Sequence, residues 1–224
     1  MKKIVERTDK NEGLMRFSTI LADPPWQFAN RTGKMAPEHR RLHRYETMKL
    51  DQICALPVPD VAAEKSHMYL WVPNALLAEG LQVMKAWGFT YKTNLVWYKV
   101  RKDGGPDGRG VGFYFRNVTE LLLFGIRGRI RTLAPGRTEV NIMVSRKQEH
   151  SKKPDLAYDL IERCSPGPYL ELFARNPREG WAQWGDEAAT SGDLRQISRQ
   201  LLENPPATVK EQNRIRVEKS LSLW

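Results

Sequence analysis

Short apolar runs of strand length alternate along this chain with segments of helical spacing. Such alternation is typical of an α/β domain, in which helices cover a central sheet. The expected strands cover residues 16–22, 67–72, 90–100, 119–126, 139–144 and 169–174, and the expected helices cover 48–56, 74–87, 154–164 and 193–204. The sequence therefore predicts the α/β fold class, with a largely buried sheet.

The length and charge of the chain indicate its organisation and its partners. At 224 residues it suits one large domain, or one domain with extensions, and its 41% hydrophobic residues supply a core. The net charge of +10 at pH 7 favours a polyanionic partner, most often nucleic acid. The alternative is that the excess charge only keeps the protein soluble.

The basic residues gather in two irregular segments that follow expected strands. Residues 30–45 hold five Lys and Arg against one Glu, and residues 99–153 hold 13 Lys and Arg against five Asp and Glu. The second segment includes the glycine-rich stretch 101–117, which is long for an internal loop. We expect both to contact nucleic-acid phosphates, through Arg31, Lys34, Arg40, Arg41, Arg44, Arg101, Lys102, Arg109 and Arg116. Solvated loops without a partner are the alternative.

Cysteine content and hydropathy favour the cytoplasm. Cys54 and Cys164 are far apart and lack metal-ligand spacing, so we expect neither a disulfide framework nor a metal site. No apolar run reaches the ~20 residues of a membrane helix. The charged N-terminus has no apolar signal-peptide core. We therefore expect a cytoplasmic protein.

The stretch "LADPPWQF" places a carboxylate and an aromatic ring at the end of an apolar run. Pro24 and Pro25 have no N–H to donate to a sheet, so the strand stops there and the chain is stiff. The exocyclic amine of a nucleobase is a poor nucleophile, and hydrogen-bond acceptors on its N–H groups would help to localise its lone pair. The Asp23 carboxylate and the Pro24 carbonyl are such acceptors, and Trp26 offers a surface for stacking an unpaired base. The alternative is a strand-terminating turn with a structural aromatic.

Four segments occur in a fixed order: "ADPPW" (22–26), "RYETM" (44–48), "MYLWV" (68–72) and "HSKKPDLAYDLIERCSPGPYLELFAR" (150–175). Together they resemble the MT-A70 family of S-adenosylmethionine-dependent adenine N6-methyltransferases. The resemblance covers residues 16–186 and implies a Rossmann-like methyltransferase fold with permuted order, in which the catalytic strand precedes the cofactor strand. The domains expected are a methyltransferase domain at 16–188, an N-terminal extension at 1–15 and a C-terminal helical extension at 189–224.

The resemblance also implies roles for individual residues. It places Asp23, Pro24, Pro25 and Trp26 in catalysis, and Tyr45 in the adenine pocket. It pairs Lys153 with the cofactor carboxylate, which suits an ammonium group. The full implied cofactor set is Asp23, Lys153, Glu171, Leu172, Arg175, Asn176, Arg178, Asp186 and Glu187. The last four stand where eukaryotic members carry a His-Asn pair and a later Asn-Gln pair.

The resemblance implies methyl transfer from S-adenosylmethionine to the N6 amine of adenine. DNA is favoured over RNA because the chain is compact, lacks an RNA-binding module and looks more like the bacterial and phage members of the family. The alternatives are an RNA adenosine methyltransferase, an N4-cytosine methyltransferase and a non-catalytic subunit that binds nucleic acid. The protein is expected to act as a monomer, a homodimer or one half of a family-type heterodimer.

Overall fold

The computed structural model describes residues 13–28, 47–108, 114–147, 152–185 and 192–203 of the chain. Every strand and helix named below lies within these residues. None of the helices among them is long and apolar enough to cross a membrane.

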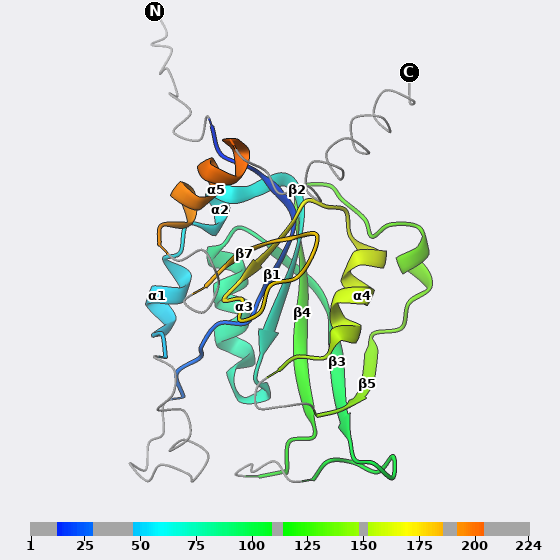
Figure 1. Cartoon of the computed structure of the whole chain (residues 1–224). Helices are drawn as coiled ribbons and strands as arrows, with labels where there is room; N and C mark the ends of the chain where they lie inside the picture. Colours follow the sequence, from blue (N-terminus) through cyan, green and yellow to red (C-terminus); the bar gives the residue numbers. More distant parts are fainter. Residues whose placement is uncertain (1–12, 29–46, 109–113, 148–151, 186–191, 204–224) are drawn as a thin grey trace, which may run out of the picture.

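Within the described residues, a sheet of seven strands forms the centre of the molecule (Figure 1). The strands are β1 (Phe17–Ala22), β2 (Ala62–Val72), β3 (Thr90–Val100), β4 (Thr119–Arg127), β5 (Ile142–Arg146), β6 (Tyr169–Leu172) and β7 (Trp181–Trp184). They lie in the order β5-β3-β4-β2-β1-β6-β7. β4 is antiparallel to β2 and β3, and every other neighbouring pair is parallel.

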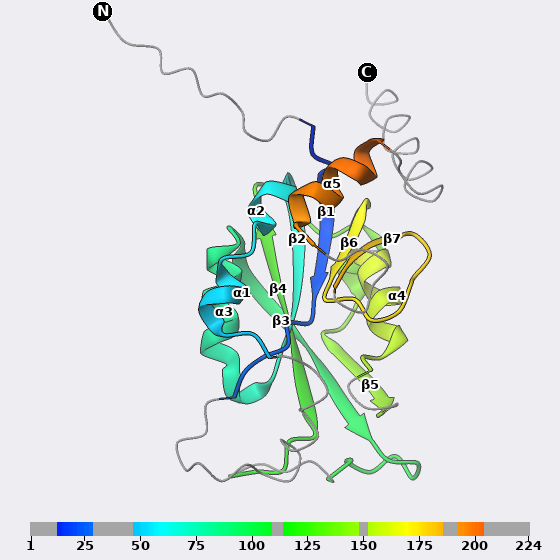
Figure 2. The ribbon, with the colours of Figure 1, turned by 60° about the vertical axis from the view of Figure 1, so that its left-hand side comes forward.

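Helices cover both faces of this sheet (Figures 1 and 2). The described helices are α1 (Leu50–Cys54), α2 (Val58–Val61), α3 (Leu77–Ala86), α4 (Asp155–Cys164) and α5 (Leu194–Glu203), with the short 3-10 helices η2 (Asn74–Leu76) and η3 (Pro135–Thr138). Val83 of α3 packs in one core cluster with Ile20. Ile161 of α4 packs in a second cluster with Leu21. Alternating side chains of β1 therefore fill the two halves of the core, one on each face.

The expected α/β class and Rossmann-like methyltransferase fold are confirmed, and β1 precedes its partner β6 in the chain as the permuted order requires. Three strands differ from expectation by two residues or more. The strand expected at 67–72 begins at Ala62, the strand expected at 139–144 lies at Ile142–Arg146, and the one expected at 169–174 ends at Leu172. β7 is not predicted from the sequence, because "WAQW" is too short for its period to be recognised.

The order of the strands creates a switch point between β1 and β6. From β1 the chain continues to β2 on one side, whereas from β6 it continues to β7 on the other. In open α/β sheets, ligands bind in the crevice at the carboxyl ends of the strands where the order reverses. Asp23 follows β1 at this point, and the segment from Phe173 to Arg175 follows β6. The fold therefore brings the two ends of the expected site together.

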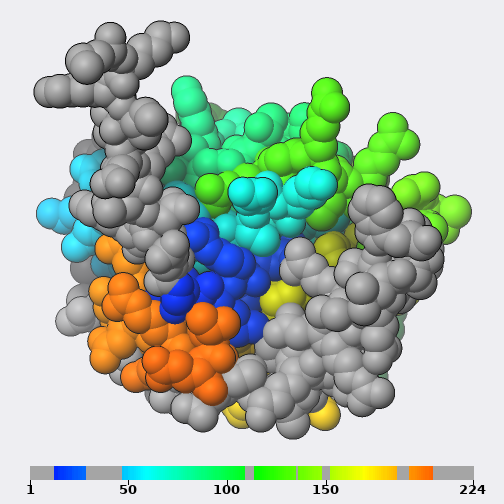
Figure 3. All heavy atoms as spheres, turned by 90° about the horizontal axis from the view of Figure 1, so that it is seen from above, coloured from blue at the N-terminus to red at the C-terminus, as the bar shows by residue number. Residues whose placement is uncertain are grey.

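The helix expected in the C-terminal extension packs onto the domain. Ser198 of α5 donates a hydrogen bond from Oγ to the carbonyl of Met15 at 2.7 Å, and Arg195 pairs with Asp60 of α2 at 2.6 Å. Leu194 is 2% exposed and belongs to the core cluster of β1. Figure 3 shows α5 beside the first described residues of the chain. The boundary at 188 stays a prediction, but α5 contributes to the core.

A buried polar cluster lies around His67, in the middle of β2. His67 is 0% exposed, and its Nδ1 shares a hydrogen bond of 2.7 Å with the hydroxyl of Ser165. The hydroxyl of Tyr69 lies 2.8 Å from the same Ser165 oxygen. Nε2 of His67 has no hydrogen-bond partner among the described residues. Burial lowers the pKa of His67 to about 4, so the imidazole is neutral in the folded protein at neutral pH.

We predict that this histidine makes folding sensitive to mild acid. The unfolded chain takes up a proton near the ordinary pKa of 6.5, whereas the folded chain does so only near 4. The free energy of unfolding therefore decreases as the pH falls from 6.5 towards 4. The decrease between pH 7.5 and pH 5 is about 2 kcal/mol. Urea unfolding at the two pH values measures this loss. Over the same pH range, the free energy of unfolding of the variant His67→Gln should decrease by about 2 kcal/mol less than that of the wild type. Equal decreases in the two proteins would contradict the prediction.

Candidate active site

The Asp-Pro-Pro-Trp segment is held rigidly after β1. The backbone N–H of Trp26 donates to the Pro24 carbonyl at 2.8 Å, and that of Met48 donates to the Pro25 carbonyl at 2.9 Å. The indole Nε1 of Trp26 donates to the carbonyl of Trp71 in β2 at 2.9 Å. Backbone and side chain together fix the direction of the segment, as the two prolines predict.

The position of Trp26 corrects one expectation. The residue is 7% exposed and packs in the core cluster of β1, which leaves little of its ring open to a base. Trp26 therefore anchors the Asp-Pro-Pro segment to β2 instead of providing the expected stacking surface. The Pro24 carbonyl accepts one hydrogen bond, from the backbone N–H of Trp26, and a carbonyl oxygen has two lone pairs.

Asp23 ends a chain of four alternating charges. Lys153 Nζ lies 2.9 Å from Asp23 Oδ2 and 2.8 Å from Glu120 Oε1. Lys99 Nζ lies 2.7 Å from the other oxygen of Glu120. These residues come from four parts of the fold: the end of β1, the segment before α4, the start of β4 and the end of β3. Their side chains are 14% to 24% exposed, so they line a site that water reaches only in part.

The charges in this network set one another's pKa values. Burial raises the pKa of Asp23 above its ordinary value, and the opposing effect of Lys153 does not cancel this. Burial alone would raise the pKa of Glu120, but Lys153 and Lys99 outweigh it and hold the pKa at about 2. Burial alone would lower the pKa of Lys153, but the two carboxylates hold it above its ordinary value. Lys153 and Glu120 therefore stay ionised at neutral pH. Of the two carboxylates, Asp23 accepts a proton more readily than Glu120.

The switch point between the ends of β1 and β6 is called the crevice below, and the end of β6 is its second wall. Phe173 has a φ of 64°, in the left-handed region that a bulky residue rarely adopts. The chain leaves the strand there, and the Ala174 N–H donates to the Trp184 carbonyl at 3.1 Å. Arg175 comes next and lies near enough to act on the pKa of Asp23. Strained backbone of this kind clusters at ligand sites.

Glu171, in β6, is held by its neighbours within the same wall. Its carboxylate accepts hydrogen bonds from the Tyr158 hydroxyl at 2.7 Å and from the Gln183 amide at 3.3 Å. Burial raises the pKa of Glu171. The side chain of Leu172 is 0% exposed and belongs to the core, so only its backbone faces the end of the strand.

Of the four residues that depart from the eukaryotic pattern, Asn176 and Arg178 lie among the described residues. Arg178 bonds Glu162 of α4 at 3.1 Å and lies 4.3 Å from the ring centre of Tyr158, so its guanidinium is tied to α4. Asn176 is exposed, and its carbonyl accepts a hydrogen bond from Gln183. Asp186 and Glu187 lie outside the described residues, as do Tyr45, Arg31, Lys34, Arg40, Arg41, Arg44 and Arg109.

The described basic residues of 101–117 lie at the same edge of the sheet as Asp23. Arg101 and Lys102 follow β3, which is parallel to β1 through the intervening strands. Arg101 is paired with Asp103 at 2.9 Å, and Arg116 donates to the Gly108 carbonyl at 2.8 Å. They thus share an edge of the sheet with Asp23, and their contact with nucleic acid stays a prediction.

Glu120 and Lys99 belong to the charge network but are not among the site residues expected from the sequence. Glu120 is the one acid in the apolar run "TELLLFGI", which is a weak signal. A carboxylate at the start of a buried strand is costly unless a positively charged group pairs with it. The partners come from residues 99 and 153, and only the folded sheet brings them together.

A sequence model of the MT-A70 family matches residues 17–187. The type II methyltransferase M.MunI from Mycoplasma sp. is 29% identical over 191 residues, which cover 77% of this chain and 78% of that protein. A putative N(6)-adenosine-methyltransferase MT-A70-like protein from Medicago truncatula is 32% identical over 180 residues, covering 78% of this chain. The human N(6)-adenosine-methyltransferase catalytic subunit METTL3 is 28% identical over 178 residues, also covering 78%.

The two eukaryotic relatives are much longer proteins. This chain spans only 27% and 28% of their lengths, whereas it spans most of M.MunI. The family match itself runs without interruption from the start of β1 to beyond β7, and so includes both walls of the crevice. The family expected from the motifs is therefore confirmed, and this chain belongs to the MT-A70 family of methyltransferases.

Proposed function

We propose that this protein transfers a methyl group from S-adenosylmethionine to the N6 amine of adenine in DNA. The observation that carries the proposal is the Asp23–Lys153 pair at the switch point of the sheet, 2.9 Å apart and next to the fixed Pro24 carbonyl. DNA is preferred because M.MunI, a type II methyltransferase, matches over most of its length. RNA is the second candidate, because METTL3, which is named as an N(6)-adenosine-methyltransferase catalytic subunit, is similar at a nearly equal identity of 28%.

The crevice fits the charge pattern of S-adenosylmethionine. The amino-acid part of that molecule carries one carboxylate and one ammonium group. Lys153 would hold the carboxylate, while Asp23 and Glu120 supply negative charge beside it. Glu171 and Arg175, at the end of β6, would face the ribose and adenosine part. When bound there, the cofactor supplies a methyl group on a positively charged sulfur.

The residues after β1 would position the target amine. Asp23 Oδ2 bonds Lys153, which leaves Oδ1 for one amine N–H, and the Pro24 carbonyl would accept the other. With both N–H groups held in this way, the N6 amine would be oriented towards the methyl group that the cofactor would supply. The amine would have to lose one proton on accepting that group. Asp23 is suited to accept the proton, because burial raises its pKa. Most of the rate would come from this fixed geometry.

Methylation of matched DNA and RNA oligonucleotides with labelled cofactor tests the proposal. Mass spectrometry of the digested products separates N6-methyladenine from N4-methylcytosine. Methylation of RNA alone would transfer the proposal to the second candidate. A non-catalytic subunit would methylate neither polymer, and calorimetric titration would show whether it still binds S-adenosylmethionine.

Asp23→Asn is predicted to reduce methyl transfer by roughly 10²–10⁴-fold, because the proton acceptor and the partner of Lys153 are lost together. The isosteric change keeps the shape of the segment, so the circular dichroism spectrum should be unchanged. Asp155→Asn is the matched control. Asp155 also faces a lysine, Lys152, but the two side chains are 60% and 47% exposed and 3.9 Å apart. Near-normal turnover by Asp23→Asn would refute the assignment of this motif.

Lys153→Met and Arg175→Ala are predicted to weaken S-adenosylmethionine binding about tenfold or more, since each removes a charged hydrogen-bond donor worth roughly 1.5–3 kcal/mol. Binding of nucleic acid should change less. Lys152→Met removes the same charge one residue away at an exposed position and should leave cofactor affinity unchanged. Isothermal titration measures the cofactor, and fluorescence anisotropy measures the nucleic acid. Unchanged cofactor affinity in both variants would show that this wall of the crevice is assigned wrongly.

A further inference from the structure

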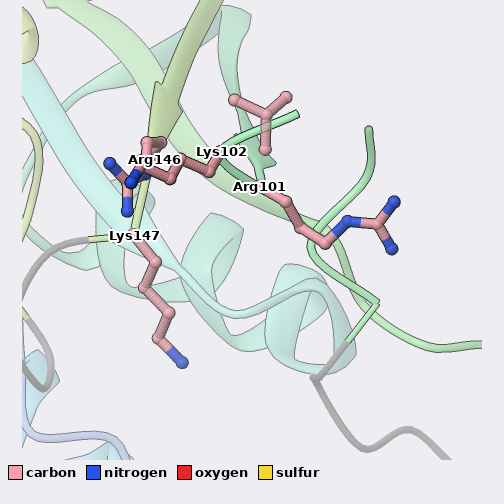
Figure 4. A pocket seen from close by; sticks show the side chains of 5 residues that line it. Arg101, Lys102, Arg146 and Lys147 are labelled. Carbon is pink, nitrogen blue, oxygen red and sulfur yellow. The ribbon is translucent and has the colours of Figure 1, made fainter. Parts of the chain in front are cut away.

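A basic pocket lies away from the crevice, where β3 and β5 end side by side. It has a volume of about 290 Å³ and is lined by Val100, Arg101, Lys102, Arg146 and Lys147. Figure 4 shows the labelled side chains, which leave the ends of the two strands and the turn after β3. The parallel register pairs Val100 with Arg146, so two basic dipeptides lie at the same level of the sheet.

The cations of this pocket differ in what they already bind. The guanidinium of Arg101 is held by Asp103 through two hydrogen bonds, at 3.1 and 2.9 Å, and it points away from the other labelled side chains (Figure 4). The side chains of Lys102, Arg146 and Lys147 make no hydrogen bond or ion pair with another described residue. Clustered cations without an acidic partner repel one another, and an anion seated between them relieves that repulsion.

We propose that this pocket is a phosphate subsite, which binds a backbone phosphate of the nucleic acid several nucleotides from the target base. The inference rests on the proposed function, and it adds Arg146 and Lys147 to the expected nucleic-acid contacts. Arg and Lys supply most contacts to phosphate oxygens, and such contacts fix the register of a protein on its substrate. The subsite orients the polymer, while the crevice carries out the chemistry.

The sheet register gives the distance from this subsite to Asp23. β3 lies three strands from β1, or about 14 Å at ~4.8 Å per strand. Ala22 is level with Leu70, Leu123 and then Asn94 in the pairing of β1, β2, β4 and β3. Val100 therefore lies about 17 Å further along the strand direction than Asp23, at ~3.3 Å per residue. The straight distance is roughly 22 Å, so a duplex with 3.4 Å per base pair needs about four to seven base pairs beyond the target to reach the subsite.

The experiment compares Arg146→Ala/Lys147→Ala with Arg129→Ala/Arg131→Ala. The control pair is exposed and follows β4, the antiparallel strand, so it lies at the opposite edge of the sheet and removes the same charge. Anisotropy with a labelled duplex extending 15 base pairs on each side of the target should show about tenfold weaker binding for the first variant at 0.1 M salt. The slope of log affinity against log salt should become shallower by about 1 to 2, since each lost phosphate contact contributes ~0.9. The control should match the wild type.

A series of shorter substrates tests the position of the subsite. Methylation by wild type and variant should differ in KM, with equal kcat, on duplexes with long flanks. With fewer than about four base pairs on both sides of the target, the two KM values should be equal. The subsite proposal would be overturned if the slope of log affinity against log salt did not change in the variant. It would also be overturned if the control variant lost as much affinity as the Arg146→Ala/Lys147→Ala variant. Tight binding of inorganic phosphate that duplex DNA does not compete away would overturn it as well, since the pocket would then serve a free anion. A wild type that methylates neither DNA nor RNA would instead overturn the proposed function.

Discussion

The placement of Lys153 between two carboxylates is the interaction on which the site depends. Its ammonium contacts Asp23 and Glu120 at 2.9 and 2.8 Å, and Lys99 neutralises the far side of Glu120. A half-buried ammonium is stable only when such partners replace its water. The network thereby joins the ends of β1 and β3, the start of β4 and the segment before α4. The folded sheet is therefore what brings these four charges together.

Rigid backbone supports this network on each side. On the β1 side, Pro24 and Pro25 restrict the chain, and Trp26 is locked to β2 through its indole N–H. On the β6 side, Phe173 adopts a left-handed backbone conformation and Gly185 leaves no space for a side chain, since a Cβ there would lie 2.8 Å from the backbone of Ala174. A site that accelerates methyl transfer by positioning needs this stiffness, because small displacements of a reacting group are costly.

The basic pocket at the ends of β3 and β5 and the crevice share one edge of the sheet for a topological reason. β1, β2, β3, β5 and β6 all run in the same direction, so their carboxyl ends meet at that edge. β4 runs the other way, which places Glu120, at its start, beside the ends of its neighbours. One antiparallel strand thus contributes a carboxylate to an edge otherwise made of strand ends.

The sequence by itself determined the elements that depend on local pattern. The apolar runs predicted six of the seven described strands, the prolines predicted a stiff end to β1, and the motifs from residue 22 to 175 predicted the family. Tertiary structure alone decided which charges meet. Glu120 carries only a weak local signal for the site and Lys99 carries none, and Trp26 carries no signal that its ring is buried. Arg146 and Lys147 reach the end of β3 only because β5 adds to the sheet edge there. The physical reason is that periodicity reports the environment of one segment, whereas an ion pair or a pocket depends on the register between segments distant in sequence.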